Sequence, residues 1–314
     1  MLQNLFGLVY LSAVLQFFSL TGAHIECPLE LNPQSVIVKY NSSVAVNCST
    51  TVLHEGLGWE ATEGAVPMTE GSLITWNVKN LRQWDMQPVC YINLNNGEQC
   101  ESFLPVIIYK TIDSMSISMV NHTMIEGKQY KLQCDIQDVA PVKSLIVKWF
   151  KGRSLVNLTT FNANTKTPVN VTTTLLITAN RTDDGVQYRC EAELELETEE
   201  SVMMSKLLYI HVNYKPKHSS SLEIISPNGN EVSLNCTVVA NPAPMYTWHS
   251  KHLQEKITSS VLTSSTLTPG NYTCTATNFL GESSKVFIKS SGSQTTFWAI
   301  HISFQLLVAL MIVI

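Results

Sequence analysis

Residues 44–60 read VAVNCSTTVLHEGLGWE, and this stretch decides the fold. Apolar and polar residues alternate into Cys48, as they do in a strand with one face in a core. Trp59 follows 11 residues later, where the core of a β-sandwich takes an aromatic residue, and Cys90 supplies the cysteine of the facing sheet. Because successive side chains of a strand point to opposite faces, an inward Trp59 turns Glu60 outward.

The same arrangement occurs three times along the chain. Two cysteines stand 42, 56 and 38 residues apart, and a tryptophan follows the first of them by 11, 15 and 12 residues. A buried tryptophan packed on a disulfide between two sheets is typical of immunoglobulin sandwiches. The sequence therefore predicts an all-β fold with three tandem immunoglobulin-like β-sandwich domains. The pairs inferred from this repeat are Cys48–Cys90, Cys134–Cys190 and Cys236–Cys274, with Trp59, Trp149 and Trp248 between them.

Two joins divide the chain, at VIIYKTID (106–113) and at YIHVNYKPKH (209–218). Neither is a Gly/Ser linker, so we expect stiff joints. In the second and third domains Tyr188 and Tyr272 stand two residues before a cysteine, which is the tyrosine-corner position. The predicted organisation is a signal peptide (1–23), domains at 24–108, 109–213 and 214–289, a stalk (290–296) and an apolar C-terminal segment (297–314).

Cys27 and Cys100 lie outside the repeat. We expect Cys27 in the first strand and Cys100 at the start of the last strand of the first domain, after the Asn95–Gly97 turn. First and last strands can be neighbours in such a sandwich, so the sequence predicts a Cys27–Cys100 bridge. An intermolecular bridge or a free pair of thiols is the alternative.

The N-terminal residues 5–20, LFGLVYLSAVLQFFSL, are apolar, and Thr21, Gly22 and Ala23 are small residues suited to cleavage. This pattern predicts a secretory signal peptide, and a membrane-spanning anchor is the alternative. The eight cysteines and eight glycosylation sequons favour secretion, because both need the secretory compartments.

The C-terminal end is apolar as well. Small residues at 290–292 precede a spacer and a short apolar run at 304–314. This order predicts a glycosylphosphatidylinositol (GPI) anchor attached at Ser290 or Ser291, and hence a membrane-attached protein on the extracellular face of the plasma membrane. A transmembrane helix without a cytoplasmic tail is the alternative.

Charge and motifs exclude several classes of function. The formal charge of −5 argues against nucleic acid as a partner. Residues 24–108 hold three Lys and Arg against nine Asp and Glu, which favours a cationic partner there. The chain has no H-E-x-x-H, Cys-x-x-Cys, G-x-S-x-G or Walker motif. We therefore expect neither an enzyme nor a cofactor or metal of its own.

The N-glycosylation sequons are concentrated outside the first domain. Only two precede residue 109, both on or near the second predicted strand, so the sheet that carries Glu60 is predicted to be free of glycans. The predicted sites are Asn41, Asn47, Asn121, Asn157, Asn170, Asn180, Asn235 and Asn271.

The first domain resembles that of the intercellular adhesion molecules. The resemblance is carried by VAVNCST (44–50), GLGWEATEG (56–64), MQPVCY (86–91) and SFLPVIIYK (102–110), and it continues through VTTTLLITANRTDDGVQYRCEAELEL (171–196). In this family a second cysteine stands four residues after each core cysteine. Here those positions are Val52 and Leu94, and the Cys27 and Cys100 pair is a candidate replacement.

The resemblance implies a ligand for leukocyte integrins. In the family, a glutamate carboxylate completes the coordination of a Mg²⁺ that the integrin holds. The matching residue here is Glu60, and Glu63 is its competitor because Thr62 stands one place late and the register can shift. Met68, Met86 and Gln87 are expected around the contact by the same resemblance.

Two other functions remain open. One is homophilic or heterophilic adhesion, or an immune-receptor ectodomain that binds no integrin. The other is a shed soluble decoy. The sequence also leaves the oligomeric state open, a homo-oligomer included.

Overall fold

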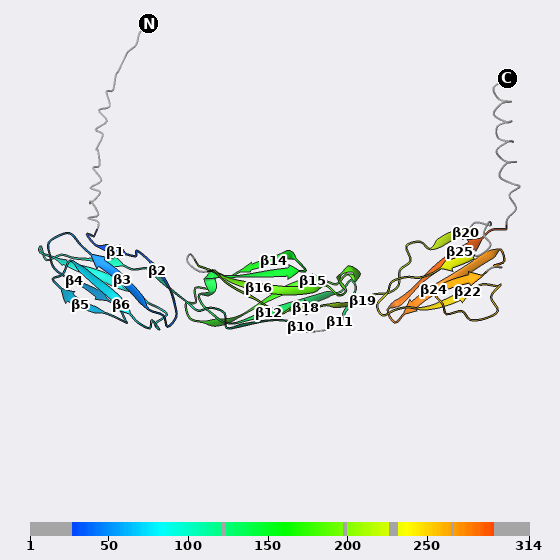
Figure 1. Cartoon of the computed structure of the whole chain (residues 1–314), viewed down its shortest axis with the longest axis horizontal. Helices are drawn as coiled ribbons and strands as arrows, with labels where there is room; N and C mark the ends of the chain where they lie inside the picture. Colours follow the sequence, from blue (N-terminus) through cyan, green and yellow to red (C-terminus); the bar gives the residue numbers. More distant parts are fainter. Residues whose placement is uncertain (1–26, 121–122, 197–199, 226–231, 265–266, 292–314) are drawn as a thin grey trace, which may run out of the picture. The chain divides into compact units, whose positions relative to one another are not determined.

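The computed structural model describes residues 27–120, 123–196, 200–225, 232–264 and 267–291 (Figure 1). These residues form strands and two short 3₁₀ turns, η1 (Val142–Ser144) and η2 (Arg181–Asp183). The chain divides into two compact units, Met1–Tyr109 and Lys110–Ile314. The prediction of an all-β chain of several immunoglobulin-like sandwiches is confirmed. The predicted signal peptide (1–23) and apolar C-terminal segment (297–314) lie outside the described residues.

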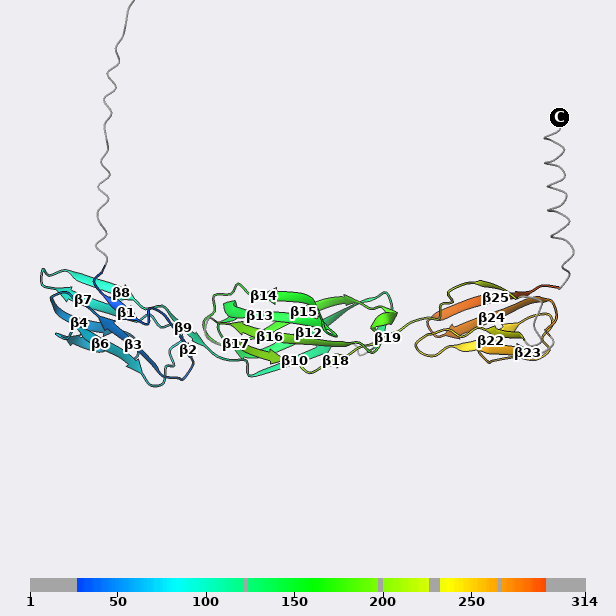
Figure 2. The same ribbon diagram turned by 45° about the horizontal axis from the view of Figure 1, so that its top comes forward.

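The first unit is the N-terminal sandwich (Figure 2). Its two sheets have the strand orders β1-β3-β6 and β5-β4-β7-β8. A parallel pair, β2-β9, completes it. Its strands are β1 (Glu30–Asn32), β2 (Val36–Lys39), β3 (Val44–Ser49), β4 (His54–Glu60), β5 (Val66–Thr69), β6 (Leu73–Val78), β7 (Val89–Leu94), β8 (Gln99–Phe103) and β9 (Val106–Tyr109).

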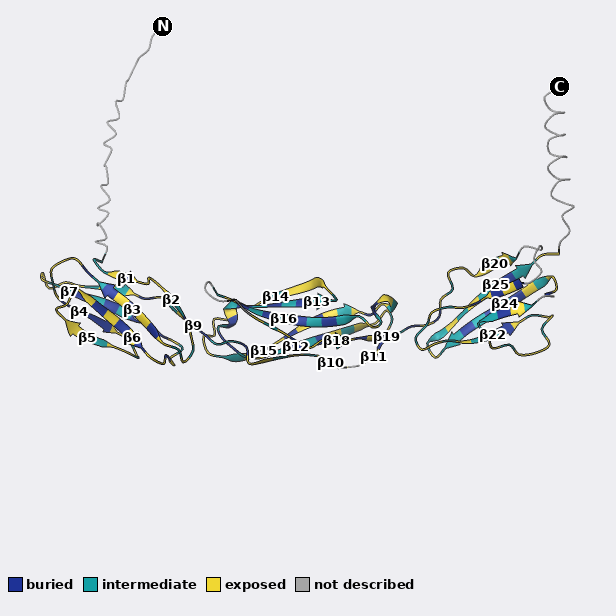
Figure 3. Cartoon of the chain, in the orientation of Figure 1, coloured by how far each residue is buried: buried dark blue, intermediate teal, exposed yellow. Residues whose placement is uncertain are grey.

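The core of this sandwich is built on the Cys48–Cys90 disulfide, which joins β3 of one sheet to β7 of the other. Trp59 is buried beside it, with its ring centroid 6.1 Å from that of Trp76. Buried and exposed residues alternate along β3, as the sequence pattern predicts (Figure 3). On β4, residues 56–59 are all buried, and the strand ends in an exposed Glu60.

Cys27 and Cys100 form the second disulfide of the N-terminal sandwich, as predicted. Two details of its expected setting are wrong. Cys27 precedes β1 rather than lying in it, and β8 is followed by one more strand, β9. The bridge therefore ties the segment before β1 to β8 at the edge of its sheet.

The central sandwich follows Lys110. Its sheets have the orders β10-β12-β15 and β14-β13-β16-β17, with β18 also paired to β16 and a short parallel pair β11-β19. Cys134–Cys190 joins the two sheets next to the buried Trp149. Its strands are β10 (Ser114–Met119), β11 (Thr123–Ile125), β12 (Gln129–Val139), β13 (Leu145–Lys151), β14 (Ser154–Thr160), β15 (Val169–Thr178), β16 (Gln187–Glu195), β17 (Glu200–Met204), β18 (Leu208–Tyr209) and β19 (His211–Asn213).

The C-terminal sandwich has the sheets β20-β25-β24-β22 and β21-β23. Trp248 packs on Phe287 at 5.6 Å between ring centroids, next to the Cys236–Cys274 disulfide. The Tyr272 hydroxyl donates to the carbonyl of Thr268 at 2.9 Å, which makes the predicted tyrosine corner. Its strands are β20 (Leu222–Ile225), β21 (Val232–Asn235), β22 (Met245–His249), β23 (Val261–Ser264), β24 (Gly270–Asn278) and β25 (Gly281–Lys289).

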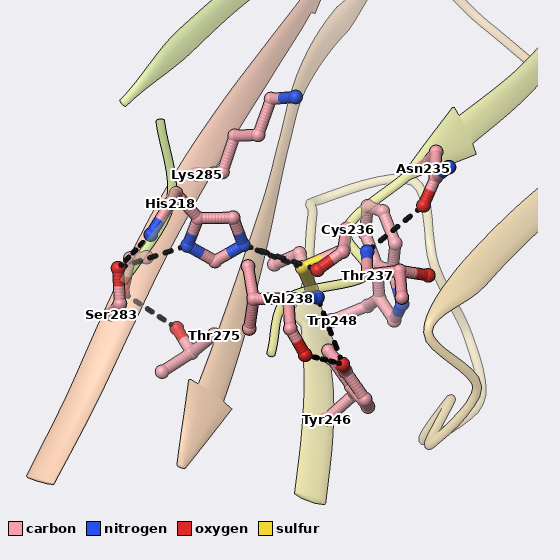
Figure 4. Close-up of a disulfide and its surroundings, with 12 residues drawn as sticks. His218, Asn235, Cys236, Thr237, Val238, Tyr246, Trp248, Thr275, Ser283 and Lys285 are labelled. Carbon is pink, nitrogen blue, oxygen red and sulfur yellow. Dashed lines mark hydrogen bonds between the residues drawn. A yellow bond between two sulfur atoms is a disulfide. The ribbon is translucent and has the colours of Figure 1, made fainter. Parts of the chain in front are cut away.

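A histidine lies against the disulfide of the C-terminal sandwich (Figure 4). The Ser283 hydroxyl is 2.9 Å from Nδ1 of His218 and accepts from the His218 amide at 3.1 Å, so its own proton is directed at Nδ1. The other ring nitrogen, Nε2, donates to the Cys236 carbonyl at 3.2 Å. Burial first, and the nearby Lys285 charge as well, lower the pKa of His218 against the effect of its hydrogen bond to Cys236.

The described chain ends in an exposed Ser290 and Ser291 directly after β25. Within the described residues, no helix has the length and apolar character needed to cross a bilayer.

Candidate functional site

Glu60 is the last residue of β4 and projects from the outer face of the sheet β5-β4-β7-β8. Its partner in register on β7 is Val89, while its neighbour Trp59 pairs with Cys90 and is buried. Among the residues that the structure describes, none donates a hydrogen bond to the Glu60 carboxylate or forms an ion pair with it. The carboxylate is therefore exposed and open to a partner.

Two glycines of β4 shape the surface beside Glu60. A Cβ at Gly58 would lie 2.3 Å from the Tyr91 hydroxyl oxygen, and a Cβ at Gly56 would lie 2.4 Å from Cγ of Met68. Real Cβ atoms do not approach other atoms so closely. Tyr91 and Met68 can therefore lie across β4 only because positions 58 and 56 have no side chain. Both glycines are buried as a result.

Apolar side chains extend this surface across the sheet. Met68 on β5 is half exposed, and its sulfur accepts from the Asn93 side chain at 3.2 Å. Phe103 on β8 is 65% exposed and pairs in register with Val89. Glu60 thus shares the outer face of one sheet with Met68, Tyr91 and Phe103. We call these four residues the β4 face.

Sequence reasoning found Glu60 and Met68 but missed Tyr91 and Phe103. A signal was present on β7, because the inward Cys90 turns its neighbour Tyr91 outward in a strand. Phe103 lies in QCESF, where apolar alternation is weak, so nothing in the pattern marks it.

Glu63 lies in a different environment. It is only partly exposed, and its carboxylate accepts from the backbone N–H of Arg82 at 3.2 Å. Its carbonyl accepts from the indole N–H of Trp76 at 2.9 Å. Glu63 therefore holds the segment after β4 against the core and the 79–88 loop.

Met86 does not reach the surface, contrary to the expectation that it lies at the rim of the contact. Its side chain is 4% exposed, and its sulfur accepts from the Thr62 hydroxyl at 2.9 Å. The 79–88 loop folds Met86 into the core to cover its edge, and no strand alternation sets the direction of a loop residue. The adjacent Gln87 is exposed.

The sheet of the β4 face is acidic. Its four strands contain no Lys or Arg, and Glu55, Glu60 and Glu101 are exposed on it. The sequons Asn41 and Asn47 lie elsewhere, since Asn47 is on β3 of the facing sheet and Asn41 precedes that strand. A cationic group would meet neither like charge nor glycan on this sheet.

Six of the described sequon asparagines share one hydrogen-bond pattern. They accept through Oδ1, and within the described residues their Nδ2 atoms donate to no partner. Five asparagines outside sequons donate through Nδ2, and two of these, Asn96 and Asn278, also accept through Oδ1. Because a glycan attaches at Nδ2, the pattern suits glycosylation. The six are Asn41, Asn47, Asn157, Asn170, Asn180 and Asn235, and the five are Asn80, Asn93, Asn96, Asn241 and Asn278.

Asn271 is also exposed, and Asn121 lies outside the described residues. In the part of the chain that the structure describes, no group of three His, Cys, Asp or Glu side chains is arranged to hold a metal ion.

Comparison with known proteins agrees with this architecture. The immunoglobulin I-set domain model matches residues 113–204, and the immunoglobulin domain model matches residues 215–290. Intercellular adhesion molecule 1 of Pan troglodytes is 26% identical over 219 residues, which are 67% of this chain and 39% of that protein. Cell adhesion molecule 1 of Homo sapiens is 24% identical over 195 residues, which are 58% of this chain and 43% of that protein. The chain thus spans less than half the length of these relatives.

Two solved structures share the fold. The ICAM-5 D1–D4 ectodomain fragment gives a TM-score of 0.50 at 16% identity and covers 83% of this chain and 76% of its own. Dpr2 Ig1–Ig2 in complex with DIP-Theta Ig1–Ig3 gives 0.51 at 14% identity and covers 83% and 99%. The similarity to intercellular adhesion molecules that the sequence predicts is therefore confirmed.

Proposed function

We propose that this immunoglobulin-superfamily chain, similar to the intercellular adhesion molecules, is a cell-surface adhesion glycoprotein that binds a leukocyte integrin through Glu60. The observation that carries the proposal is the exposed, unpaired carboxylate at the end of a rigid strand, beside an open apolar surface. A ligand for a metal-dependent receptor needs both features.

The role of Glu60 follows from its chemistry. A Mg²⁺ held by the integrin requires octahedral oxygen donors and accepts one carboxylate from a partner. Glu60 supplies that carboxylate without first breaking an internal ion pair. Trp59 fixes its direction, because the buried indole and the register with β7 hold the end of β4 in place.

Glu60 is a better donor than Glu63 for the same reason. Glu63 would have to leave the Arg82 amide to reach a partner, and that amide would lose its acceptor. Met68, Tyr91 and Phe103 then supply the apolar contact around the metal bond, with Gln87 as an exposed polar neighbour. In protein interfaces, a few central residues usually provide most of the binding energy, and the contacts around them exclude water.

The acidic sheet supports a metal-bearing partner, since its charge attracts a cationic site over distances within the Debye length. The absence of sequons from its strands supports access for a protein partner. No cofactor or metal of this chain's own enters the proposal, and neither does enzymatic activity.

The rest of the chain presents this site. We infer three immunoglobulin domains at 24–108, 109–213 and 214–289, N-glycans at the eight sequons, and a lipid anchor at Ser290 or Ser291. Phosphatidylinositol-specific phospholipase C should release the protein from cells, and its retention would favour a transmembrane helix. The same release would produce the soluble decoy form.

The cation requirement tests the function directly. Leukocytes should adhere to cells that display the full chain in Mg²⁺, detach in EDTA, and adhere again when Mg²⁺ is restored. The exposed apolar part of the β4 face would also suit adhesion without an integrin. In that case, cells displaying the chain would clump or bind other cells equally well in EDTA.

A further inference from the structure

The central sandwich has an exposed sheet face whose two edge strands are apolar. Along the edge strand β14 the outward Leu155 and Leu158 are 52% and 48% exposed. Along β17, at the opposite edge, the outward Val202 and Met204 are 51% and 62% exposed. A sheet face that meets only water is usually polar, so apolar side chains along both edges indicate a covered surface.

The two strands between these edges carry opposite charges. β13 contains lysine as its only charged residue type, and Lys148 points outward from it because Trp149 is buried. β16 presents Glu191 and Glu193 on the same face, with one arginine, Arg189. The face therefore has a basic strand and a mainly acidic strand side by side.

These charges are paired within the face. Lys148 contacts the Glu193 carboxylate, and Arg189 is 2.9 Å from that of Glu191. The Arg189 guanidinium also lies 4.3 Å from the centroid of the outward Phe150 ring. Paired charges cost less to desolvate than isolated ones, so the centre of this face can be covered by a partner.

The strand register aligns the face in rows. One row across the four strands is Leu158, Lys148, Glu191 and Met204, in the order β14, β13, β16 and β17. In the next row Leu155 and Phe150 pair with each other, and Phe150 pairs with Arg189. At the centre of the face, Lys148 thus lies beside Glu191 in the first row, and Phe150 lies beside Arg189 in the second.

The glycan predicted on β14 does not cover this face. Asn157 pairs directly with Trp149, which is buried, and directly opposed residues project to the same side of a sheet. Asn157 therefore projects to the side opposite Leu155 and Leu158. β13, β16 and β17 contain no sequon.

We propose that this face binds a second copy of the same chain around a two-fold axis that runs parallel to the strands, between β13 and β16. That axis places β13 of one copy on β16 of the other. Lys148 then faces Glu191 of the second copy, and Leu158 faces its Met204. By the same symmetry each contact forms twice.

A two-fold axis that runs across the strands does not bring opposite charges together. It places β13 on β13, and that strand has no acidic residue to meet Lys148. Because the favoured axis runs along the strands, the central sandwiches of the two copies point the same way. This arrangement fits two copies on one cell surface, and it leaves the β4 face unused.

Paired cysteines test both the face and the axis. The described chain has no free cysteine, so one introduced thiol is the only reactive one. Differently tagged full-length chains carrying Leu158→Cys and Met204→Cys are expressed together in cells, and surface dimers are read on a non-reducing gel. The mixture should give a disulfide-linked heterodimer that neither variant gives alone. Thr174→Cys, exposed on the facing sheet, is the matched control.

Two outcomes overturn the proposal. If Leu158→Cys cross-links to itself as strongly as to Met204→Cys, the axis is wrong. If the mixture gives no more dimer than Thr174→Cys at equal surface level, the face does not bind a second copy and serves another protein or none.

Exchanging charges provides an independent check without cysteines. Lys148→Glu alone and Glu191→Lys alone each place like charges across the axis, so each should lose self-association. Mixing the two variants should restore it, because every contact then joins opposite charges. Equal association of single and mixed variants would contradict the proposed register.

Discussion

Tyr91 lies across Gly58, its partner in register on the neighbouring strand, so closely that a Cβ at Gly58 would come 2.3 Å from the phenol oxygen. The missing side chain on β4 is what allows the aromatic ring to lie over Gly58, two residues before Glu60. Through this contact, the side chain of Tyr91 covers part of β4 and makes the β4 face continuous from β7 to β4.

Gly58→Val should therefore displace Tyr91 and weaken integrin binding by about tenfold, the loss of one good interface anchor. Valine suits a strand, so the sandwich itself should fold. Binding to cells that display the full chain measures the effect. Gly71→Ala is the matched control, since a Cβ there has no atom closer than 3.7 Å. Unchanged binding of Gly58→Val would remove Tyr91 from the interface.

Glu63→Ala should lower the free energy of unfolding by about 1 kcal/mol, because the Arg82 amide loses its acceptor. Leukocyte binding should stay near the wild-type level in Mg²⁺. Thermal unfolding and adhesion measured on the same preparation separate the two effects. Loss of adhesion with unchanged stability would instead make Glu63 the metal ligand.

The Cys27–Cys100 bridge spans 73 residues of the chain. In the chain-entropy model a loop of that length contributes about 4 kcal/mol, so the double variant Cys27→Ala/Cys100→Ala should unfold the N-terminal sandwich well below the wild-type temperature. Hydrogen exchange of β3 and β7 reports on that sandwich alone. Equal protection in both proteins would show that Cys48–Cys90 and the core suffice.

The stability of the C-terminal sandwich should fall as the pH drops below about 6.5, the ordinary pKa of histidine. The pKa of His218 is lowered in the folded state, so the unfolded chain binds the proton more readily. Protonation would also direct an N–H at Ser283, whose hydroxyl now donates to Nδ1, while Lys285 repels the new charge. The stability that neutral His218 contributes is thus fully present above about pH 6.5 and is lost as the pH falls from there through the lowered pKa of the folded state.

Hydrogen exchange of β24 between pH 7.5 and 5, compared with His218→Gln, measures this dependence. The variant should lack the loss below about pH 6.5, because glutamine does not titrate there. An identical pH profile in both proteins would assign the effect to another group.

Most of the fold could be predicted from the alternation of apolar and polar residues in the strands. Cys48, Trp59 and Cys90 set which face is buried, and Glu60 follows from Trp59 by the two-residue period of a strand. The same period could have identified Tyr91 from Cys90. The directions of these side chains could be predicted because strand periodicity depends only on neighbouring residues and not on tertiary contacts.

The residues that the sequence could not locate depend on contacts between distant segments. Met86 lies in the 79–88 loop, where no period applies, and it packs into the core with its sulfur hydrogen-bonded to Thr62, which lies 24 residues earlier. Glu63 differs from Glu60 in its partial burial and in its hydrogen bond to Arg82. Gly56 and Gly58 appear in the sequence as weak strand residues, and only the side chains of Met68 and Tyr91 explain them.

The most direct test of the account is the Mg²⁺-dependent binding of leukocyte integrin to cells that display the full chain with Glu60→Gln. Glu55→Gln is the matched control, because Glu55 is an exposed glutamate on the same strand. We predict that wild type and Glu55→Gln bind in Mg²⁺ and lose binding in EDTA, while Glu60→Gln binds in Mg²⁺ no better than wild type does in EDTA. Wild-type levels of Mg²⁺-dependent binding by Glu60→Gln would contradict the account.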